Sequence, residues 1–521
     1  MVNKSKYIAA FDIGTTSIKC SVIDINNFEP IAKASTKSII NYPKKGWAEQ
    51  DPNILWESII STFKETIEKI MGKESISAII FGAHMAGIVP VDKSGNPLRS
   101  IIIWLDERAA GLPRELWKGL IKLQGYSIFR LIKFLRITGG APSKTGKDVI
   151  SKIIWIKENE PDIFNKTYKF LDVKGYLINK CTNKFITSPD EANLSWLADT
   201  KHGKAKWSLE LLKDYKLSVD LFPEIKQSTE IAGRLSKEAA VQFGIGDDVP
   251  VIVGAGDITS AAIGSGAVKE GELHIYVGTS DWIAGHISKR KVDVFHYVGS
   301  LLSAIPNKYL LIAEQEVAAG SLEWMMSMLG MEKDYEKVDK LVRETNKTDI
   351  LFLPWFYGER SPIDNPFVRG GLLNLTLDTK KEEILRSIME GVALNIKWAY
   401  PYVEKMTEKQ QEIINIVGGG ALFDLWCQLI ADSIRKPVRR ISNPQLAGVR
   451  GSAAIASIAI GAFKNFDEIV LRFRIDKIFK PDANSSEIME KKFKEFKKTY
   501  ENLKDIFKRL NKLYNLGNGL K

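Results

Sequence analysis

Two segments far apart in the chain share a pattern that could hold a phosphate group. Residues 7–24 read as an apolar strand, a Gly-Thr-Thr turn at 14–16 and a second apolar stretch, and residues 273–286 repeat this order around a Gly-Thr-Ser turn. Each turn can offer backbone N–H groups and hydroxyls to a phosphate. One such turn could be an ordinary hairpin, but the pair suggests two related domains closing over one polyphosphate. The candidate phosphate ligands are Gly14, Thr15, Thr16, Gly278 and Thr279.

Two aspartates at strand ends could supply the other parts of a phosphoryl-transfer site. Such a site needs a place for Mg²⁺ and a base for the attacking hydroxyl, and little covalent chemistry from the protein. Asp12 ends the first strand and could hold Mg²⁺, because carboxylates and phosphates share the metal's octahedral sphere. A turn-capping Asp would look the same. Asp257 follows a buried strand and two glycines, and it could be the general base, an N-cap, or both.

Glycines between a strand and a helix indicate a place for a flat ring. Gly419, Gly420 and Ala421 follow an apolar strand, and small residues there could let adenosine approach the backbone. Gly320 could serve the same face. Two rival nucleotide motifs are incomplete: residues 140–148 have the wrong glycine spacing for a P-loop, and the glycines from 254 onward do not complete a dinucleotide fingerprint.

Bulk composition limits the class of protein. At 521 residues the chain is too long for a single core, and it fits two domains of about 200 to 250 residues each. Its 45% hydrophobic and 26% charged residues are typical of a soluble globular protein. We find no charged-then-apolar leader and no apolar run of about 18 residues. The sequence therefore predicts no membrane partner and a cytoplasmic location.

The charge and the cysteines point to no further class of partner. The net charge of +11 could indicate nucleic-acid binding, but the lysines are scattered and are not interleaved with aromatic residues, so we expect none. The three cysteines, Cys20, Cys181 and Cys427, are spaced too widely for a disulfide framework or a zinc site. We expect reduced thiols.

The hydrophobic pattern predicts α/β organisation, with a first domain over residues 1–250 and a second over 251–521. The expected strands lie near 7–12, 18–24, 76–81, 100–104, 249–253 and 413–417, and the expected helices near 52–71, 315–330 and 380–406. From Ser485 onward, apolar residues recur every three or four positions with lysines between them, which predicts an amphipathic helix. That helix could lie on a membrane, but we favour packing against the second domain.

In this order, the motifs resemble the FGGY family of carbohydrate kinases, within the superfamily of sugar kinases, actin and heat-shock chaperone ATPases. The resemblance runs over nearly the whole chain. Besides the two turns, it rests on residues 46–52 (GWAEQDP), 103–108 (IWLDER), 158–161 (ENEP), 353–360 (LPWFYGER), 389–393 (MEGVA) and 421–426 (ALFDLW).

This resemblance implies two actin-like (ribonuclease H-like) domains with an active cleft between them. It implies ATP and Mg²⁺ bound mainly against the second domain, and a small sugar or polyol bound mainly by the first. Asp257 matches the family's catalytic base. Domain closure upon sugar would exclude water and limit wasteful ATP hydrolysis.

The acceptor segment departs from the patterns of known relatives. Xylulose kinases usually carry Gln-Met-His-Gly where this chain has His84, Met85, Ala86 and Gly87. Glycerol kinases usually place Arg-Glu at the two middle positions, which argues against an ordinary glycerol kinase. Xylulose kinases also often have Asn after the catalytic Asp, where this chain has Ile258. Lost polar contacts of this kind can shift specificity strongly.

Five residues form the predicted sugar side. Asp106 and Arg108 match the xylulose and gluconate kinase pattern, and Asp106 could accept hydrogen bonds from sugar hydroxyls. His84 could supply an imidazole, or could simply be buried, because neighbouring strand residues point to opposite faces. The sugar-side set is His84, Met85, Trp104, Asp106 and Arg108.

The sequence thus predicts an ATP-dependent kinase for a pentulose-type sugar, with D-xylulose as the first guess. Gluconate, glycerol, and another polyol or ketose remain alternatives. An actin-like ATP-binding regulator without kinase activity is an alternative of another class, although such a switch needs no base for an alcohol nucleophile. The chain could also pair as a homodimer.

Overall fold

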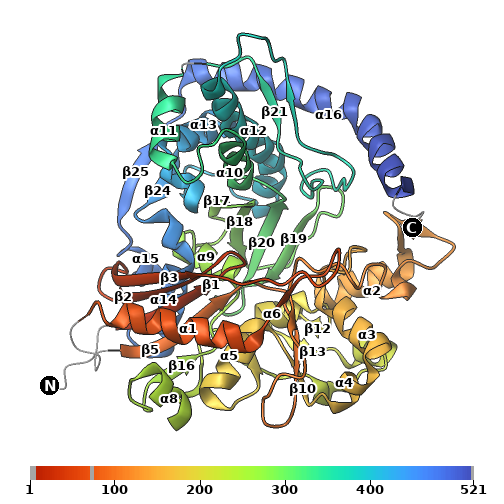
Figure 1. Cartoon of the computed structure of the whole chain (residues 1–521), viewed down its shortest axis with the longest axis vertical. Coiled ribbons are helices and arrows are strands. Elements are labelled where there is room, and N and C mark those ends of the chain that lie inside the picture. Colours follow the sequence, from red (N-terminus) through yellow and green to blue (C-terminus); the bar gives the residue numbers. More distant parts are fainter. Residues whose placement is uncertain (1–6, 71–75, 346, 518–521) are drawn as a thin grey trace.

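The computed structural model describes residues 7–70, 76–345 and 347–517. Its two largest sheets lie in different halves of the molecule, as Figure 1 shows. The first sheet has the strand order β15-β16-β5-β1-β2-β3. Its strands are β1 (Tyr7–Ile13), β2 (Ser17–Asp24), β3 (Pro30–Lys37), β5 (Ile76–Ala83), β15 (Ile231–Arg234) and β16 (Pro250–Ile252).

Strand β1 is apolar and buried from Ile8 to Phe11, because both faces of the first sheet are covered there. Ala9 and Phe11 pack with α1 (Pro52–Ile67) on one face. Ile8 and Ala10 pack on the other face with α9 (Asp257–Gly264) and α14 (Ala447–Ala459). This alternation is the period of two expected of a strand.

The second sheet has the order β19-β20-β18-β17-β23-β24-β25. One face packs against α12 (Lys381–Thr407) and α13 (Asp424–Ile434), and the other meets α9 and α14 through Trp282 and Ala284. The strands are β17 (Leu273–Val277), β18 (Asp281–Ile287), β19 (Val298–Leu302), β20 (Tyr309–Gln315), β23 (Ile414–Val417), β24 (Val438–Ile441) and β25 (Ile475–Phe479). Since α9 and α14 contribute to the cores of both sheets, they join the two halves.

The crossing of α9 and α14 is very close. A side chain at Gly264 would lie 1.8 Å from the carbonyl oxygen of Ala447, and one at Gly451 would lie 1.7 Å from that of Ser260. Only glycine fits at these two positions, so the crossing fixes the direction of α9. Asp257 is the first residue of that helix.

The remaining elements surround these sheets. The short strand pairs are β4 (Glu49–Gln50) with β7 (Ile101–Ile102), β6 (Val89–Val91) with β10 (Lys169–Leu171), β8 (Lys122–Leu123) with β9 (Tyr126–Ser127), β11 (Ile186–Thr187) with β14 (Glu224–Ile225), β12 (Ala198–Asp199) with β13 (Lys206–Trp207), and β21 (Leu351–Leu353) with β22 (Gly371–Leu373). The remaining helices are α2 (Ile128–Thr138), α3 (Val149–Asn159), α4 (Pro161–Lys166), α5 (Val173–Thr182), α6 (Pro189–Leu194), α7 (Leu209–Asp214), α8 (Lys237–Phe243), α10 (Ala319–Met328), α11 (Tyr335–Glu344), α12 (Lys381–Thr407), α13 (Asp424–Ile434), α15 (Phe466–Val470) and α16 (Ala483–Gly517).

The C-terminal helix α16 packs against the half of the molecule that holds the second sheet. Its residues Met489, Phe496 and Tyr500 join the core of that half, and the Phe496 ring lies 5.1 Å from the ring of Trp355. The prediction of packing is therefore confirmed. None of the helices in the described part of the chain is both long and apolar enough to cross a membrane.

The predicted division at residue 250 falls at the start of a strand. Strand β16 (Pro250–Ile252) belongs to the first sheet, and the second sheet begins at Leu273. Helix α9 lies between the two. The domain ranges 1–250 and 251–521 stay a prediction.

Candidate active site

The two predicted phosphate turns are tight hairpins. Strands β1 and β2 pair antiparallel up to Ile13 and Ile18, and the N–H of Gly14 donates to the carbonyl of Ser17 at 2.9 Å. Strands β17 and β18 pair in the same way, and the N–H of Gly278 donates to the carbonyl of Ser280 at 2.9 Å. Thr16 and Thr279 are exposed at the tips. Their hydroxyls can therefore meet a ligand.

The second turn is held from two sides. The start of α10 covers it, with the N–H of Ala318 donating to the Thr279 carbonyl at 2.8 Å. A side chain at Gly320 would lie 3.0 Å from Cγ2 of Thr279, and one at Gly278 would lie 2.4 Å from the Tyr276 ring. That ring stacks on Trp282 at 3.8 Å. A side chain at Gly278 would therefore displace the Tyr276 ring, and one at Gly320 would fit only tightly against Thr279.

Asp12 lies near the end of β1 with its side chain 19% exposed, so it can reach a ligand. One carboxylate oxygen, Oδ2, accepts a hydrogen bond from Nζ of Lys19 at 3.1 Å. The absence of a side chain at Gly448 leaves room beside the carboxylate, because a Cβ there would lie 3.3–3.4 Å from its atoms. The predicted metal ligand therefore has space on one side and a cation on the other.

Asp257 is the partly exposed first residue of α9, and Gly256 is the N-cap. Its Oδ1 accepts the N–H of Ile258 at 2.9 Å. Burial of the carboxyl, and after it the negative charge of Asp12, raises the pKa of Asp257 to about 7. A carboxyl with such a pKa can accept a proton near neutral pH. Because Asp12 has this effect, the two carboxyls are close enough to repel each other.

The segment after β23 presents one open position. Gly418 has φ 98°, and a Cβ there would lie 2.3 Å from the carbonyl oxygen of Val277. Gly420 and Ala421 are buried, and a side chain at Gly420 would collide with Val277 at 2.5 Å. Gly419 is exposed, with nothing within 4 Å of an added Cβ. Of the three residues predicted to admit adenosine, Gly419 alone has open space around it.

Two sugar-side residues lie close to the elements just described. The indole N–H of Trp104 donates to Oγ1 of Thr15 at 3.2 Å, which links residues 103–108 to the first turn. Met85 packs against Gly256, where an added Cβ would lie 2.4 Å from the Met85 sulfur. Thus Trp104 reaches the first phosphate turn, and Met85 reaches the backbone beside Asp257.

His84 is buried, and its Nε2 lies 2.9 Å from Oε1 of Gln50. Burial, and then the charge of Lys152, lowers the pKa of His84 to about 4. The ring is therefore neutral at pH 7. Of the two interpretations of His84 that the sequence allows, this geometry agrees with the buried side chain.

The side chains of Asp106 and Arg108 form a fully buried ion pair. Oδ1 of Asp106 accepts from the N–H and Nε of Arg108 at 2.9 Å each, and Oδ2 accepts from Nη2 of Arg108 at 2.7 Å and from the N–H of Ala48 at 2.6 Å. Each oxygen thus has two donors, which fills its usual capacity. The guanidinium lies 3.7 Å from the centre of the Trp47 ring. In this conformation Asp106 orients Arg108.

Sequence reasoning missed three charged residues near this region: Lys19, Asp190 and Lys152. Asp190 is buried, and its Oδ2 accepts the N–H of Gly256 at 2.8 Å. Lys152 is buried, and its Nζ donates to the carbonyl of Ala86 at 2.6 Å. Lys152 stands in the apolar run of residues 149–156, so a lysine among residues expected to be buried was a signal that could have been used.

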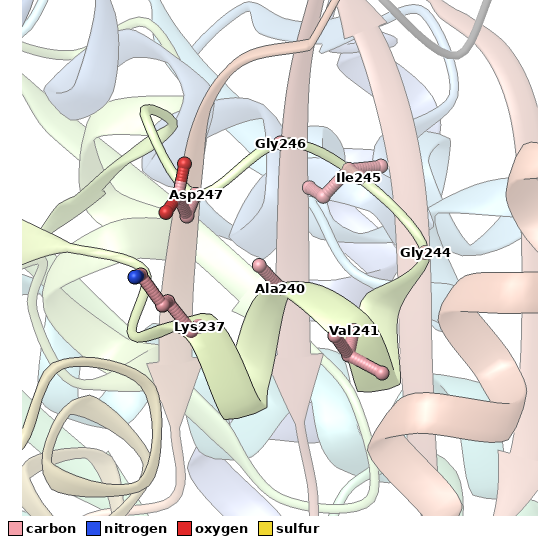
Figure 2. A pocket seen from close by; sticks show the side chains of 7 residues that line it. All are labelled: Lys237, Ala240, Val241, Gly244, Ile245, Gly246 and Asp247. Carbon is pink, nitrogen blue, oxygen red and sulfur yellow. The ribbon is translucent and has the colours of Figure 1, made fainter.

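A groove elsewhere on the molecule holds none of the predicted residues. It has a volume of about 680 Å³ and lies at the end of α8 (Figure 2). Its lining residues are Lys237, Ala240, Val241, Gly244, Ile245, Gly246 and Asp247. With one lysine and one aspartate as its only charged groups, it offers no set of converging polar side chains.

The residues present fit a magnesium ion that is shared with phosphates. Within the described ranges, no group of three or more His, Cys, Asp or Glu side chains could hold a metal ion. Mg²⁺ in phosphoryl-transfer sites is usually held by one or two carboxylates, with waters and phosphate oxygens completing its sphere. The accessible carboxylate of Asp12 meets that requirement, and a cation there would offset its repulsion with Asp257.

The chain is similar to known carbohydrate kinases over most of its length. Models of the FGGY family of carbohydrate kinases match residues 7–264 with the N-terminal domain and residues 273–460 with the C-terminal domain. A xylulose kinase from Staphylococcus xylosus is 25% identical, and the match covers 89% of this chain and 93% of that protein. A gluconokinase from Bacillus subtilis is 26% identical, over 89% of this chain and 90% of that protein. The crystal structure of a ligand-bound xylulose kinase from Lactobacillus acidophilus superposes with a TM-score of 0.84 at 25% identity, over 97% of this chain and 99% of that one.

Proposed function

The chain belongs to the FGGY family of carbohydrate kinases, and from this premise we propose that it transfers the γ-phosphoryl group of ATP to a hydroxyl of a pentulose, with D-xylulose as the first candidate. The enzyme class, an ATP:sugar phosphotransferase, follows from the family. The observation that carries the proposed reaction is Asp257, a partly exposed carboxyl at the start of α9 whose pKa is raised to about 7.

Asp257 acts as the general base in this proposal. In its ionised form it accepts the proton of the attacking hydroxyl as the bond to phosphorus forms. Two features support the assignment: the raised pKa suits proton transfer near neutral pH, and the N-terminus of α9 fixes the side chain through the hydrogen bond from Ile258. The glycine-dependent crossing with α14 holds the helix itself.

Asp12 would hold Mg²⁺ together with the phosphates of ATP. The ion, when bound, neutralises charge that develops on the transferred phosphoryl group. The exposed hydroxyls of Thr16 and Thr279 and the N–H groups of the two turns would cradle the phosphates. Gly320 supports the second turn, and Gly419 leaves space that suits adenosine.

The acceptor would lie beside Met85 and Trp104. Met85 reaches the backbone next to Asp257, and Trp104 reaches the first turn, so a sugar in contact with both would have a hydroxyl near the base. We assign Asp106 and Arg108 a supporting role on this side, because their charged groups are buried and bonded to each other. His84 is assigned to packing.

Gluconate is the second candidate acceptor, because the gluconokinase of Bacillus subtilis matches this chain at 26% identity, close to the 25% of the xylulose kinase. Glycerol and another polyol or ketose remain further alternatives within the family. A regulator without kinase activity would not need the base Asp257.

We also propose that the enzyme is cytoplasmic, because the described free cysteines, all buried, would stay reduced there. A homodimer is also proposed.

The experiment that tests the function is a coupled ADP-release assay with Mg-ATP and a panel of acceptors. The panel comprises D-xylulose, L-xylulose, D-ribulose, L-ribulose, gluconate, glycerol, erythritol and dihydroxyacetone. A kcat/KM for D-xylulose well above all the others is the expected result. ATP turnover that no acceptor stimulates would overturn the proposal and favour the regulator.

A further inference from the structure

Lys152 is a fully buried lysine on the side of the molecule where the acceptor is proposed to bind. It lies in α3, between residues Ile150 and Ile153 that are themselves 0% exposed. Taking an ammonium group out of water is costly unless other groups compensate for the lost hydration. A lysine kept at such a position therefore calls for a specific partner.

The partner of Lys152 is the backbone of the loop at residues 84–87, beside which the acceptor is proposed to bind. Nζ of Lys152 donates to the carbonyl oxygen of Ala86 at 2.6 Å. Burial lowers the pKa of Lys152 to about 7, while the negative charges of Asp148 and then Asp106 act in the opposite direction. These two carboxylates favour the ammonium form of Lys152, while the nearby cations Arg108 and Lys147 oppose it.

Ala86 needs such an anchor because its backbone is strained. Its φ is 57°, in the left-handed region that residues other than glycine rarely adopt. The next residue, Gly87, is pressed against Val173, where an added Cβ would lie 2.6 Å from a side-chain carbon. The preceding residue, Met85, packs against Gly256. The hydrogen bond from Lys152 thus fixes Ala86, whose neighbours Met85 and Gly87 are both tightly packed.

We propose that Lys152 is a positioning residue for the acceptor: by holding the Ala86 carbonyl, it keeps residues 84–87 in the conformation that places Met85 beside the base. Lys152 acts through this loop and does not itself touch the sugar, since its side chain is buried. The inference rests on the proposed function in one respect, namely that the acceptor binds at this loop.

The test compares Lys152→Met and Lys152→Arg with the control Lys157→Met. Lys157 lies on the same helix, and its Nζ also donates to carbonyls, those of Tyr215 at 3.1 Å and Lys216 at 2.7 Å, but away from the loop. The first readout is hydrogen–deuterium exchange of the peptide that covers residues 84–88, which needs no substrate. The second readout compares the change in the KM for the acceptor with the change in the KM for Mg-ATP, each relative to the wild-type protein.

Lys152→Met is expected to speed exchange in this peptide and to raise the acceptor KM about tenfold, since small misplacements of reacting groups have large effects. The KM of Lys152→Met for Mg-ATP should stay within about twofold of the wild-type value. Lys152→Arg should recover part of the loss because it keeps a hydrogen-bond donor. The control Lys157→Met should leave both readouts unchanged. Unchanged exchange in Lys152→Met, or equal losses for both substrates, would overturn the inference. Wild-type protein that phosphorylates no acceptor would refute the proposed function, while the exchange measurement would still decide whether Lys152 holds the loop.

Discussion

The carboxylate of Asp190 accepts a hydrogen bond of 2.8 Å from the backbone N–H of Gly256, the residue just before Asp257. Asp190 is 0% exposed, and its other oxygen accepts hydrogen bonds from the hydroxyl of Ser188 and, at 3.0 Å, from the N–H of Glu191. A buried carboxylate on α6 therefore holds the start of α9. It also places a negative charge near the base, which contributes to the raised pKa of Asp257.

This relationship predicts the pH dependence of the enzyme. The base works in its ionised form, so kcat/KM for the acceptor should fall as the pH drops through about 7. Asp190→Asn keeps an oxygen for the Gly256 N–H but removes the charge, which lowers the pKa of Asp257. Because burial and the charges of Asp12 and Glu314 raise this pKa more than Asp190 does, the acidic limb of the pH profile should move to lower pH by less than about one unit. A limb that stays at the wild-type pH while the fold is intact would contradict this role for the Asp190 charge.

A side chain at Gly278 should damage the second phosphate turn. Its Cβ would lie 2.4 Å from the Tyr276 ring, which is itself stacked on Trp282. Gly278→Ala should lower the free energy of unfolding by about 1 to 3 kcal/mol, the usual cost of overpacking, and should weaken ATP binding in calorimetric titration. Gly299→Ala in the same sheet is the matched control, because nothing lies within 4 Å of its added Cβ. Equal ATP affinities for the two variants would argue against a phosphate role for this turn.

Buried histidines should make the protein sensitive to acid. Burial lowers the pKa of His274 to about 3 and that of His286 to about 4, and His84 is lowered similarly. In the unfolded chain these groups take up protons near pH 6.5, whereas in the folded protein they do not. The contribution of these histidines to stability should therefore be complete above about pH 6.5 and should be lost as the pH drops from there toward 4.

Thermal unfolding measured between pH 7.5 and pH 4.5 checks this expectation. His286→Gln should flatten the profile, because it removes one of the groups that must stay neutral in the folded state. A Tm that is constant down to pH 5 in the wild-type protein would mean that other groups compensate for the histidines.

The local features of the site could be predicted from the sequence because they depend on neighbouring residues. The turns at 14–16 and 278–280 lie between strands as expected, since strand, glycine and strand follow one another directly. The strand expected near 100–104 extends only over Ile101–Ile102, because the N–H of Asp106 already turns back to the carbonyl of Ile103 at 3.1 Å.

Contacts between distant segments were not accessible in this way. The sequence separates Asp190 from Gly256 by 66 positions and Lys152 from Ala86 by the same 66, and no local pattern announces either hydrogen bond. The pairing of Asp106 with Arg108 is local, but its complete burial depends on Ala48 and Trp47 from another part of the chain. In this conformation both carboxylate oxygens of Asp106 are therefore bonded to protein donors.

If Asp257 is the base of a sugar kinase, single-turnover phosphorylation of D-xylulose at saturating Mg-ATP should distinguish the wild-type protein from Asp257→Asn. The variant keeps the size and the hydrogen-bond acceptor of the side chain but cannot take the proton. Asp257→Asn should phosphorylate D-xylulose more slowly by a factor of about 10² to 10⁴, with an unchanged Kd for Mg-ATP. A near-normal rate in Asp257→Asn would contradict this role of Asp257.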